Sequence, residues 1–389
     1  MKLSPTALDG RIESLDIMRG FSLLGIFIAN MLVFHTPYMH LDPYTWFSSN
    51  SDEITFRWID IFVQGSFYPI FAFLFGYGIN MQYEKSLDRK TPFAPLMAKR
   101  LSILLVIGLL HALLLWSGDV LFAYASLGFL LILFVRIPAK WLIPFAGVLY
   151  IIPVGLIYFT MRLIAKTSPD LLLEDFADVD KVESSIQIFA NGTFGEIFTF
   201  RFFEWLVVGL GGAFMGIFIV LPIIMLGAAL SKLKVIERAS ELKGKIAIVT
   251  IVGFALGLWI KVLPHLGNPT YDLVLLQDTF GGVILAAGYV GLLLLFCTNP
   301  IFRRVFRPVG KAGRMSLTTY ITQSIVATTI FYSYGFGLYG KVDLITGTWI
   351  AVGVFILQVL FAELWLSKFR MGPLEWLWRR GTYGGNSSK

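Results

Sequence analysis

A histidine and an aspartate lie close together at a tight turn between two apolar runs. His111 stands in the outer part of the run that follows Arg100, and Asp119 opens the run that returns. A carboxylate beside an imidazole orients the ring and raises its basicity, as in a general base. The pair is predicted to be a base, an acyl-carrying histidine or a hydrogen-bonded structural pair. No metal is expected, because no second ligand lies at a diagnostic spacing.

Further polar residues interrupt apolar runs on the same side of the predicted membrane as His111. Asp60 and Gln64 are four residues apart, so they share one face of a helix. Arg201 and Glu204 are three residues apart and do the same. Each residue alone is typical of a helix end, but together they predict a polar vestibule that opens to the exterior. The predicted vestibule comprises Asn30, Asp60, Gln64, Arg201, Glu204, Gln277 and Asp278.

The ninth apolar run carries a polar stripe at helical spacing. Ser316, Tyr320 and Gln323 recur on one face, and the stripe ends at Ala327. Such a stripe is either a contact between helices or the wall of a cavity. Two other histidines, His40 and His265, fall in loops and are interpreted as surface residues.

The first run carries two opposite charges near its inner end. Asp16 and Arg19 are three residues apart, a spacing at which they can form an ion pair. The pair either fixes the helix or places a charge at the mouth of a cavity. In the second case Arg19 is available to a phosphate or a carboxylate.

The amino-acid composition indicates which class of protein holds these residues in place. Of the 389 residues, 56% are apolar and 15% are charged, against about 25% charged in ordinary soluble domains. This composition excludes a soluble enzyme, a disordered chain and a disulfide scaffold, and it predicts an integral membrane protein. The single cysteine, Cys297, excludes an intramolecular disulfide, a thiolate zinc site and an iron–sulfur cluster.

Apolar runs long enough to cross a bilayer predict an all-α, polytopic fold of about ten transmembrane helices. They cover residues 17–35, 58–81, 100–117, 119–135, 141–161, 202–230, 246–264, 279–298, 315–334 and 345–366. Most of the 32 Lys and Arg residues lie on one side of these runs, which predicts that both termini are cytoplasmic. The net charge of +7 is therefore a sign of topology, and no nucleic-acid partner is expected.

The chain is predicted to be one transmembrane domain over residues 1–389. Residues 162–201 form its largest external loop, and residues 367–389 an amphipathic tail on the cytoplasmic leaflet. No internal repeat is visible, which counts against a two-repeat transporter. Glycines in the sixth run allow two helices to approach closely, so a homo-oligomer is an alternative to a monomer.

Six motifs in order along the chain carry a family resemblance. They are Arg11-x-x-Ser14-Leu15-Asp16-x-x-Arg19-Gly20, Phe67-Tyr68-Pro69-Ile70-Phe71-Ala72-Phe73-Leu74-Phe75-Gly76-Tyr77-Gly78, Gly108-x-x-His111, Trp116-x-Gly118-Asp119-x-Leu121-x-x-Tyr124, Gly313-Arg314-Met315-Ser316-Leu317-Thr318-x-Tyr320-x-x-Gln323 and Gly372-Pro373-x-Glu375-Trp376-Leu377-Trp378-Arg379. The series resembles the YeiB-like membrane family over nearly the whole chain. The first motif, with Asn30 later in the same run, also resembles membrane acyltransferases of the heparan-α-glucosaminide N-acetyltransferase kind.

The resemblance implies that a cytoplasmic acyl-CoA is the co-substrate and that an extracytoplasmic glycan or small hydroxyl is the acceptor. Asp16 and Arg19 fall on the shared charged motif, and Asn30 falls on a polar site residue. The catalytic histidine is either His35, which lies near its place in the glucosaminide enzymes, or His111, which belongs to the YeiB-like pattern.

The residues are consistent with that chemistry. His111 is the expected base and Asp119 its orienter, while Asn30 and Gln64 are candidate oxyanion donors. Substrate contacts are also expected from Asp60, Arg201, Glu204, Tyr320 and Gln323. The CoA phosphates are expected to meet Asp16, Arg19, Lys311 and Arg314 at the inner mouth. The alternatives are a transporter or flippase for a small organic anion or lipid, and a non-catalytic membrane component. We expect a multi-pass protein of a bacterial cytoplasmic membrane.

Overall fold

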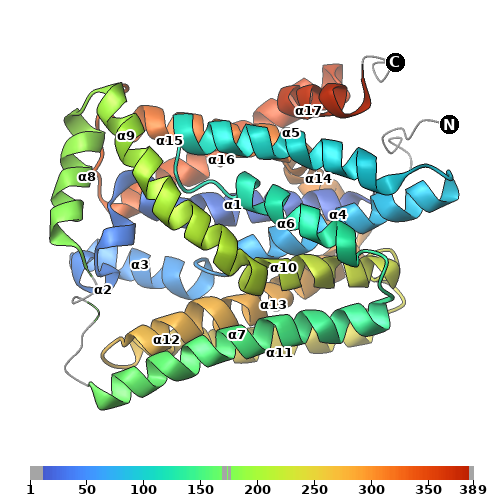
Figure 1. Cartoon of the computed structure of the whole chain (residues 1–389), viewed down its shortest axis with the longest axis horizontal. Coiled ribbons are helices and arrows are strands. Elements are labelled where there is room, and N and C mark those ends of the chain that lie inside the picture. Colours follow the sequence, from blue (N-terminus) through green and yellow to red (C-terminus); the bar gives the residue numbers. More distant parts are fainter. Residues whose placement is uncertain (1–11, 169–172, 174–176, 385–389) are drawn as a thin grey trace.

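Helices form all of the regular structure in residues 12–168, 173 and 177–384, the residues that this computed structural model describes. Eight helical spans there are long and apolar enough to cross a membrane. Because lipid offers no hydrogen bonds to the backbone, apolar runs of this length fold as helices. The predicted all-α, polytopic membrane fold is confirmed, with the long helices running in a common direction (Figure 1).

Ten helical segments correspond to the ten predicted runs. The long spans are α1 (Glu13–His35), α3 with α4 (Asn50–Phe62 and Phe67–Asp88), α5 (Phe93–Leu114), α7 (Ala139–Thr167), α10 (Leu210–Lys232), α11 (Lys243–Val262), α12 with α13 (Tyr271–Leu276 and Gly282–Cys297) and α16 (Leu344–Lys368). The fourth and ninth runs are shorter helices, α6 (Leu121–Phe134) and α15 (Ser316–Phe331), of 14 and 16 residues. The remaining helices are α2 (Pro43–Trp46), α8 (Val179–Asn191), α9 (Phe194–Glu204), α14 (Pro300–Arg314) and α17 (Pro373–Tyr383).

Three predicted boundaries are wrong for local reasons. The second run is broken between α3 and α4, where Gly65 has a φ of +71°, a left-handed value that glycine adopts without strain. The sixth run begins earlier and passes from α9 to α10 through the π-helical segment Trp205–Gly209. The eighth run begins at Tyr271 and passes through a second π-helical segment, Gln277–Gly281. Such segments are often found at functional sites.

Much of the segment 162–201, predicted as the largest external loop, is helical. The segment holds the end of α7, all of α8 and the first part of α9. A capping box formed by Thr193 and Glu196 starts α9. Residues 169–172 and 174–176 of this segment lie outside the described residues, as do Arg11 of the first motif and residues 385–389 of the tail.

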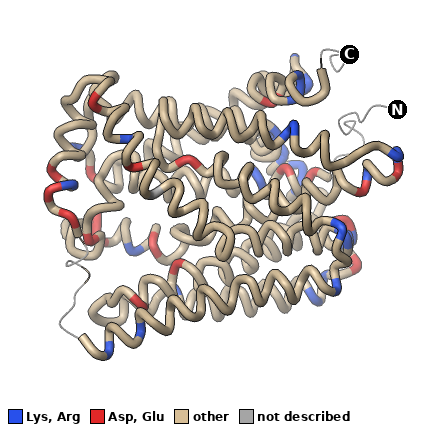
Figure 2. Tube along the Cα trace, viewed as in Figure 1, with Lys and Arg blue, Asp and Glu red and all other residues tan. Residues whose placement is uncertain are grey.

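Many Lys and Arg residues lie at the end of the bundle where α14 and α17 lie (Figure 2). We call this the basic end, and it includes five arginines that line two adjoining cavities: Arg19, Arg100, Arg303, Arg314 and Arg379. Helix α1 begins at the same end. The predicted orientation, with both termini on the cytoplasmic side, rests on this gathering of Lys and Arg through the positive-inside rule.

A close helix pair forms the centre of the bundle. A Cβ atom added to Gly76 in α4 would lie 1.8 Å from the Ile224 carbonyl oxygen of α10, and one added to Gly227 would lie 2.0 Å from that of Phe73. Only glycine allows the two backbones to approach so closely. By contrast, a Cβ atom added to Gly211 or Gly212, also in α10, would have nothing within 4 Å among the described residues, so these glycines make no such approach.

The tail does form an amphipathic helix, α17, but it is docked on the bundle. Its Glu375 is only 7% exposed and accepts hydrogen bonds from the backbone N–H groups of Leu317 and Thr318, at 2.7 and 3.1 Å. The Thr318 hydroxyl donates to the other carboxylate oxygen at 2.6 Å. Burial raises the pKa of Glu375, and these hydrogen bonds oppose the shift. Since α15 has no cap from its own N-cap residue, Glu375 caps it from a distant helix.

Replacing Glu375 with alanine should lower the free energy of unfolding by about 1–3 kcal/mol, because buried N–H donors of α15 lose their acceptor. Glu375→Gln retains an acceptor and should lose less. Thermal unfolding in detergent measures both variants, with Glu363→Ala on the half-exposed side of α16 as a control. Equal melting temperatures for Glu375→Ala and the unmodified protein would contradict a capping role.

Candidate functional site

The predicted pair of His111 and Asp119 is present. His111 lies in the last turn of α5, and its Nδ1 is 2.8 Å from an oxygen of Asp119, in the connection to α6. The second carboxylate oxygen accepts a hydrogen bond from the backbone N–H of Phe122 at 2.7 Å, which ties Asp119 to the start of α6. Both side chains are almost fully buried, at 1% and 0% exposed. The short hairpin therefore holds the imidazole in one orientation, away from water.

A third residue, which the sequence analysis did not single out, completes this group. Ser324 of α15 lies with its Oγ 2.8 Å from His111 Nε2, and it is 1% exposed. The ring of Tyr320, one turn earlier, is centred 5.1 Å from the imidazole. We call Asp119, His111 and Ser324 the relay cluster. An oriented base beside a hydroxyl is the arrangement that activates a nucleophile.

A cavity of about 160 Å³ leads from the basic end toward the relay cluster. Arg19, Arg100, Arg314 and Arg379 line it together with apolar side chains of α4 and α5. Tyr320, whose ring lies against His111, also lines it, and so does Val120, which follows Asp119 in the chain and donates its backbone N–H to the Tyr320 hydroxyl. We call it the basic cavity. Cations beside an apolar wall fit a ligand that has both phosphates and an apolar chain.

A second, smaller pocket of about 50 Å³ lies on the other side of the α5–α6 connection. We call it the outer pocket, and it is lined by Trp116, Ser117 and Gly118. Val120, two residues after Gly118 in the same connection, lines the basic cavity. The polar wall of the outer pocket is formed by Glu204, which accepts hydrogen bonds from His40 at 2.9 Å and Ser117 at 3.2 Å. The interpretation of His40 as a surface residue is wrong, since it is largely buried against Glu204.

The four residues predicted to meet CoA all lie at the basic end, but they line two cavities. Arg19 lines the basic cavity and forms the predicted ion pair with Asp16 at 3.1 Å. Asp16 and Lys311 line a larger, open cavity of about 790 Å³ beside it. Lys311 is paired there with Glu363. Arg314 lines both cavities, so it links them.

Two predicted substrate residues have contacts that hold helices together. Arg201 is fully buried and donates hydrogen bonds to the carbonyl oxygens of Leu114 and Leu115 at the end of α5, just after His111. Gln323 is 2% exposed and donates to Gln358 of α16 at 3.2 Å. Both side chains thus satisfy backbone or amide groups within the bundle. Their contribution to the site is to fix α5 and α15.

Asn30, Gln64 and His35 lie away from the relay cluster. Asn30 is half-buried in α1 and lines neither the basic cavity nor the outer pocket. His35 is fully buried at the end of α1, with Nδ1 2.5 Å from the Met31 carbonyl oxygen, and its Nε2 has no hydrogen-bond partner among the described residues. The structure gives neither Asn30 nor His35 a contact with His111, so of the two candidate catalytic histidines only His111 has an orienting carboxylate among the described residues.

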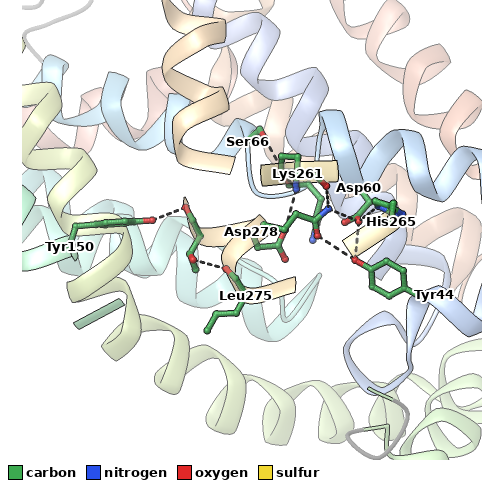
Figure 3. A network of polar contacts seen from close by, with 11 residues as sticks. Tyr44, Asp60, Ser66, Tyr150, Lys261, His265, Leu275 and Asp278 are labelled. Carbon is green, nitrogen blue, oxygen red and sulfur yellow. Dashed lines mark hydrogen bonds and ion pairs between the residues drawn. The ribbon is translucent and has the colours of Figure 1, made fainter. Parts of the chain in front are cut away.

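The predicted vestibule is not one site, because Asp60 belongs to a separate buried network (Figure 3). Asp60 accepts hydrogen bonds from Tyr44 at 3.1 Å, His265 at 2.8 Å and Gln277 at 2.7 Å. These partners lie in α2, after α11 and at the start of a π-helical segment. The interpretation of His265 as a surface residue is therefore also wrong. Burial, and then the charge of Asp60, raise the pKa of Tyr44, so its hydroxyl stays a donor.

Lys261 supplies the buried positive charge of the same network. Its side chain is 0% exposed, and Nζ lies 2.9 Å from the Gln64 carbonyl oxygen and 3.4 Å from Asp278. Gln64 thus enters through its backbone and not through its amide. Hydrogen bonds join α3, α11 and the second π-helical segment here, so the network is a candidate structural centre of this part of the bundle. No group of residues that could hold a metal is found among the described residues.

Known proteins are similar to this chain over almost its full length. The family described as "Protein of unknown function (DUF418)" matches residues 230–385. The chain is 32% identical to uncharacterized protein YxaH of Bacillus subtilis over 396 residues, 98% of this chain and 96% of the relative. It is 26% identical to uncharacterized protein YeiB of Escherichia coli over 400 residues, 96% of each. The chain therefore belongs to the YeiB-like membrane protein family.

Proposed function

We propose that this protein is a membrane acyltransferase, which moves an acyl group from cytoplasmic acyl-CoA to a hydroxyl acceptor on the other side of a bacterial cytoplasmic membrane. The observation that carries the proposal is the buried pair of His111 and Asp119, because the chain neighbours of Asp119 line the outer pocket on one side (Gly118) and the basic cavity on the other (Val120). An oriented base between two openings suits a group transfer whose two substrates arrive from opposite sides.

The basic cavity is the proposed site for the CoA part. Its arginines present planar, permanently charged donors to phosphate oxygens. The apolar wall beyond them, which includes Leu104 and Phe71, would take the pantetheine arm and the acyl group. A thioester that reaches Tyr320 lies next to the relay cluster.

The outer pocket is the proposed entry of the acceptor. Glu204 and Ser117 offer hydrogen-bonding groups to a small polyol or a glycan end. The base takes the proton of the attacking hydroxyl, which makes the oxygen a better nucleophile. Cations at one mouth and a carboxylate at the other favour a phosphorylated donor on one side and a neutral hydroxyl on the other.

Replacing Arg314 with alanine should raise the KM for acyl-CoA about 10- to 100-fold, because a charge-assisted contact of about 1.5–3 kcal/mol is lost. The effect on kcat should be small. Arg303→Ala is the matched control, since Arg303 lines the neighbouring open cavity but not the basic cavity. A KM that Arg314→Ala leaves unchanged would argue against CoA in the basic cavity.

The function itself is tested in vesicles that contain the purified protein. Acetyl-CoA and longer acyl-CoAs are supplied on one side, free CoA thiol is measured, and labelled acyl groups are followed to hydroxyl compounds on the other side. We expect CoA release that depends on His111. No binding and no release across the panel would reject the proposal, and flux of an anion or lipid without thiol release would identify a transporter.

A further inference from the structure

We propose that Ser324 is the nucleophile of a two-step transfer and carries the acyl group as an ester between the two sides of the membrane. This inference rests on the proposed function and adds a covalent intermediate to it. The observation behind it is the relay cluster, in which both ring nitrogens of His111 have a side-chain partner.

The tautomer of His111 follows from those partners. An ionised Asp119 can only accept a hydrogen bond, so Nδ1 carries the proton. Nε2 is then an acceptor, and the hydroxyl that lies 2.8 Å from it belongs to Ser324. The only base nitrogen in the cluster is therefore already directed at the serine. A nucleophile, a base and an orienting carboxylate in this order is the arrangement of serine acyl transfer.

Ser324 differs from the neighbouring hydroxyls of α15. Thr322, Thr328 and Thr329 donate hydrogen bonds to carbonyl oxygens of their own helix. Such bonds are common for a hydroxyl in a membrane helix, and the hydroxyl proton is then held by a carbonyl oxygen and not directed at a base. Ser324 instead faces an imidazole from another helix. A merely structural hydroxyl at this position would need no carboxylate behind the imidazole.

The place of Ser324 along α15 also fits a carrier. Tyr320 lines the basic cavity, and Ser324 follows it by one turn on the same helix face, about 6 Å farther from the basic end. The outer pocket reaches Gly118 on the other side of the connection that carries Asp119. An acyl group on Ser324 would lie beyond the donor cavity while CoA stays behind, so only the acyl group crosses.

The two steps balance. In the first, Ser324 Oγ attacks the thioester carbonyl carbon, a carbon–oxygen bond forms and the carbon–sulfur bond breaks. The serine proton passes to His111 Nε2 and then to the leaving thiolate, which departs as CoA thiol. In the second, the acceptor oxygen attacks the acyl carbon, a new carbon–oxygen bond forms and the bond from that carbon to Ser324 Oγ breaks. The acceptor proton passes through the same nitrogen to Oγ, and Ser324 is restored.

Trapping the intermediate tests the inference. The purified protein is mixed with labelled acetyl-CoA without acceptor, quenched in acid and mapped by peptide mass spectrometry. We expect one acetyl group on the peptide that contains Ser324 and a burst of CoA thiol equal to the enzyme concentration. Ser324→Ala should lower transfer at least about 100-fold and lose the label, while CoA binding stays intact. Ser324→Cys should carry a thioester that hydroxylamine releases. Thr322→Ala, on the same helix, is the matched control.

The outcomes separate this inference from the function on which it rests. Full transfer by Ser324→Ala would overturn the serine carrier and leave a direct transfer. A label on His111 would also overturn it and would make the histidine the carrier. No CoA release from the unmodified protein would instead reject the proposed function. If Ser324→Ala fails to fold, the mapped label and the hydroxylamine sensitivity of Ser324→Cys still decide.

Discussion

Replacement of His111 by alanine is expected to lower CoA release from acyl-CoA at least about 100-fold, the contribution of a positioned general base. Among the described residues, the imidazole is the only base that touches both Asp119 and Ser324. Alanine removes the proton acceptor and leaves the arginines of the basic cavity in place. The loss should therefore fall on kcat, with the KM for acyl-CoA nearly unchanged.

Asp119→Asn should show an intermediate loss. An asparagine amide can donate to Nδ1, which would stabilise the tautomer with its proton on Nε2 and remove the base. His35→Ala serves as the control for loss of a buried histidine, because the contacts of His35 are with Met31 and Phe331 and not with the relay cluster. Thiol release and thermal stability are measured on the same samples. A fully active His111→Ala protein would exclude His111 as the base, and fully active His111→Ala and His35→Ala proteins together would remove both histidine candidates.

Replacement of Lys261 by methionine is expected to lower the free energy of unfolding by about 1–3 kcal/mol, the cost of leaving its buried polar partners without a donor. The Lys261 side chain is fully buried, but that of Asp278 is 37% exposed, so water weakens their ion pair. The methionine fills a similar volume, so the loss reports charge and hydrogen bonds more than packing. Asp60 and Asp278 would remain in the bundle without the cation that lies among them. The Gln64 carbonyl oxygen would lose its donor as well.

A second substitution separates charge from shape. Lys261→Met with Asp278→Asn removes both members of the pair and should recover part of the lost stability, since no lone carboxylate remains at that position. Thermal unfolding in detergent follows the single and double variants. Additive losses in the double variant would mean that Lys261 and Asp278 do not interact, and would contradict the network in Figure 3.

The parts of the site that are local in sequence were predictable, and the distant ones were not. His111 and Asp119 lie on either side of one tight hairpin, so their contact follows from the turn alone. Asp16 and Arg19 lie on one helix face, so their ion pair follows from spacing. Ser324 contacts His111 across 213 positions of chain, and the sequence does not indicate which of the several hydroxyls of α15 faces the imidazole.

The predicted vestibule failed for the same reason. The pattern of apolar runs assigns Asp60 and Glu204 to one side of the membrane, but two residues at the same depth can lie in different parts of a bundle. Asp60 lies with Lys261, whereas Glu204 lies with His40 and Ser117. Helix neighbours are set by side-chain packing around the whole bundle, and hydropathy alone does not encode them.

The cap on α15 has a consequence for biosynthesis. Because α17 follows α15 and α16 along the chain, Glu375 is synthesised after Tyr320 and Ser324. Until α17 docks, two backbone donors at the start of α15 have no acceptor. A nascent chain that stops before α17 would therefore contain all the residues of the relay cluster, but its α15 would lack the Glu375 cap. Assembly of the buried site would be one of the last events of synthesis, which delays any reactivity of the serine until the bundle around it is closed.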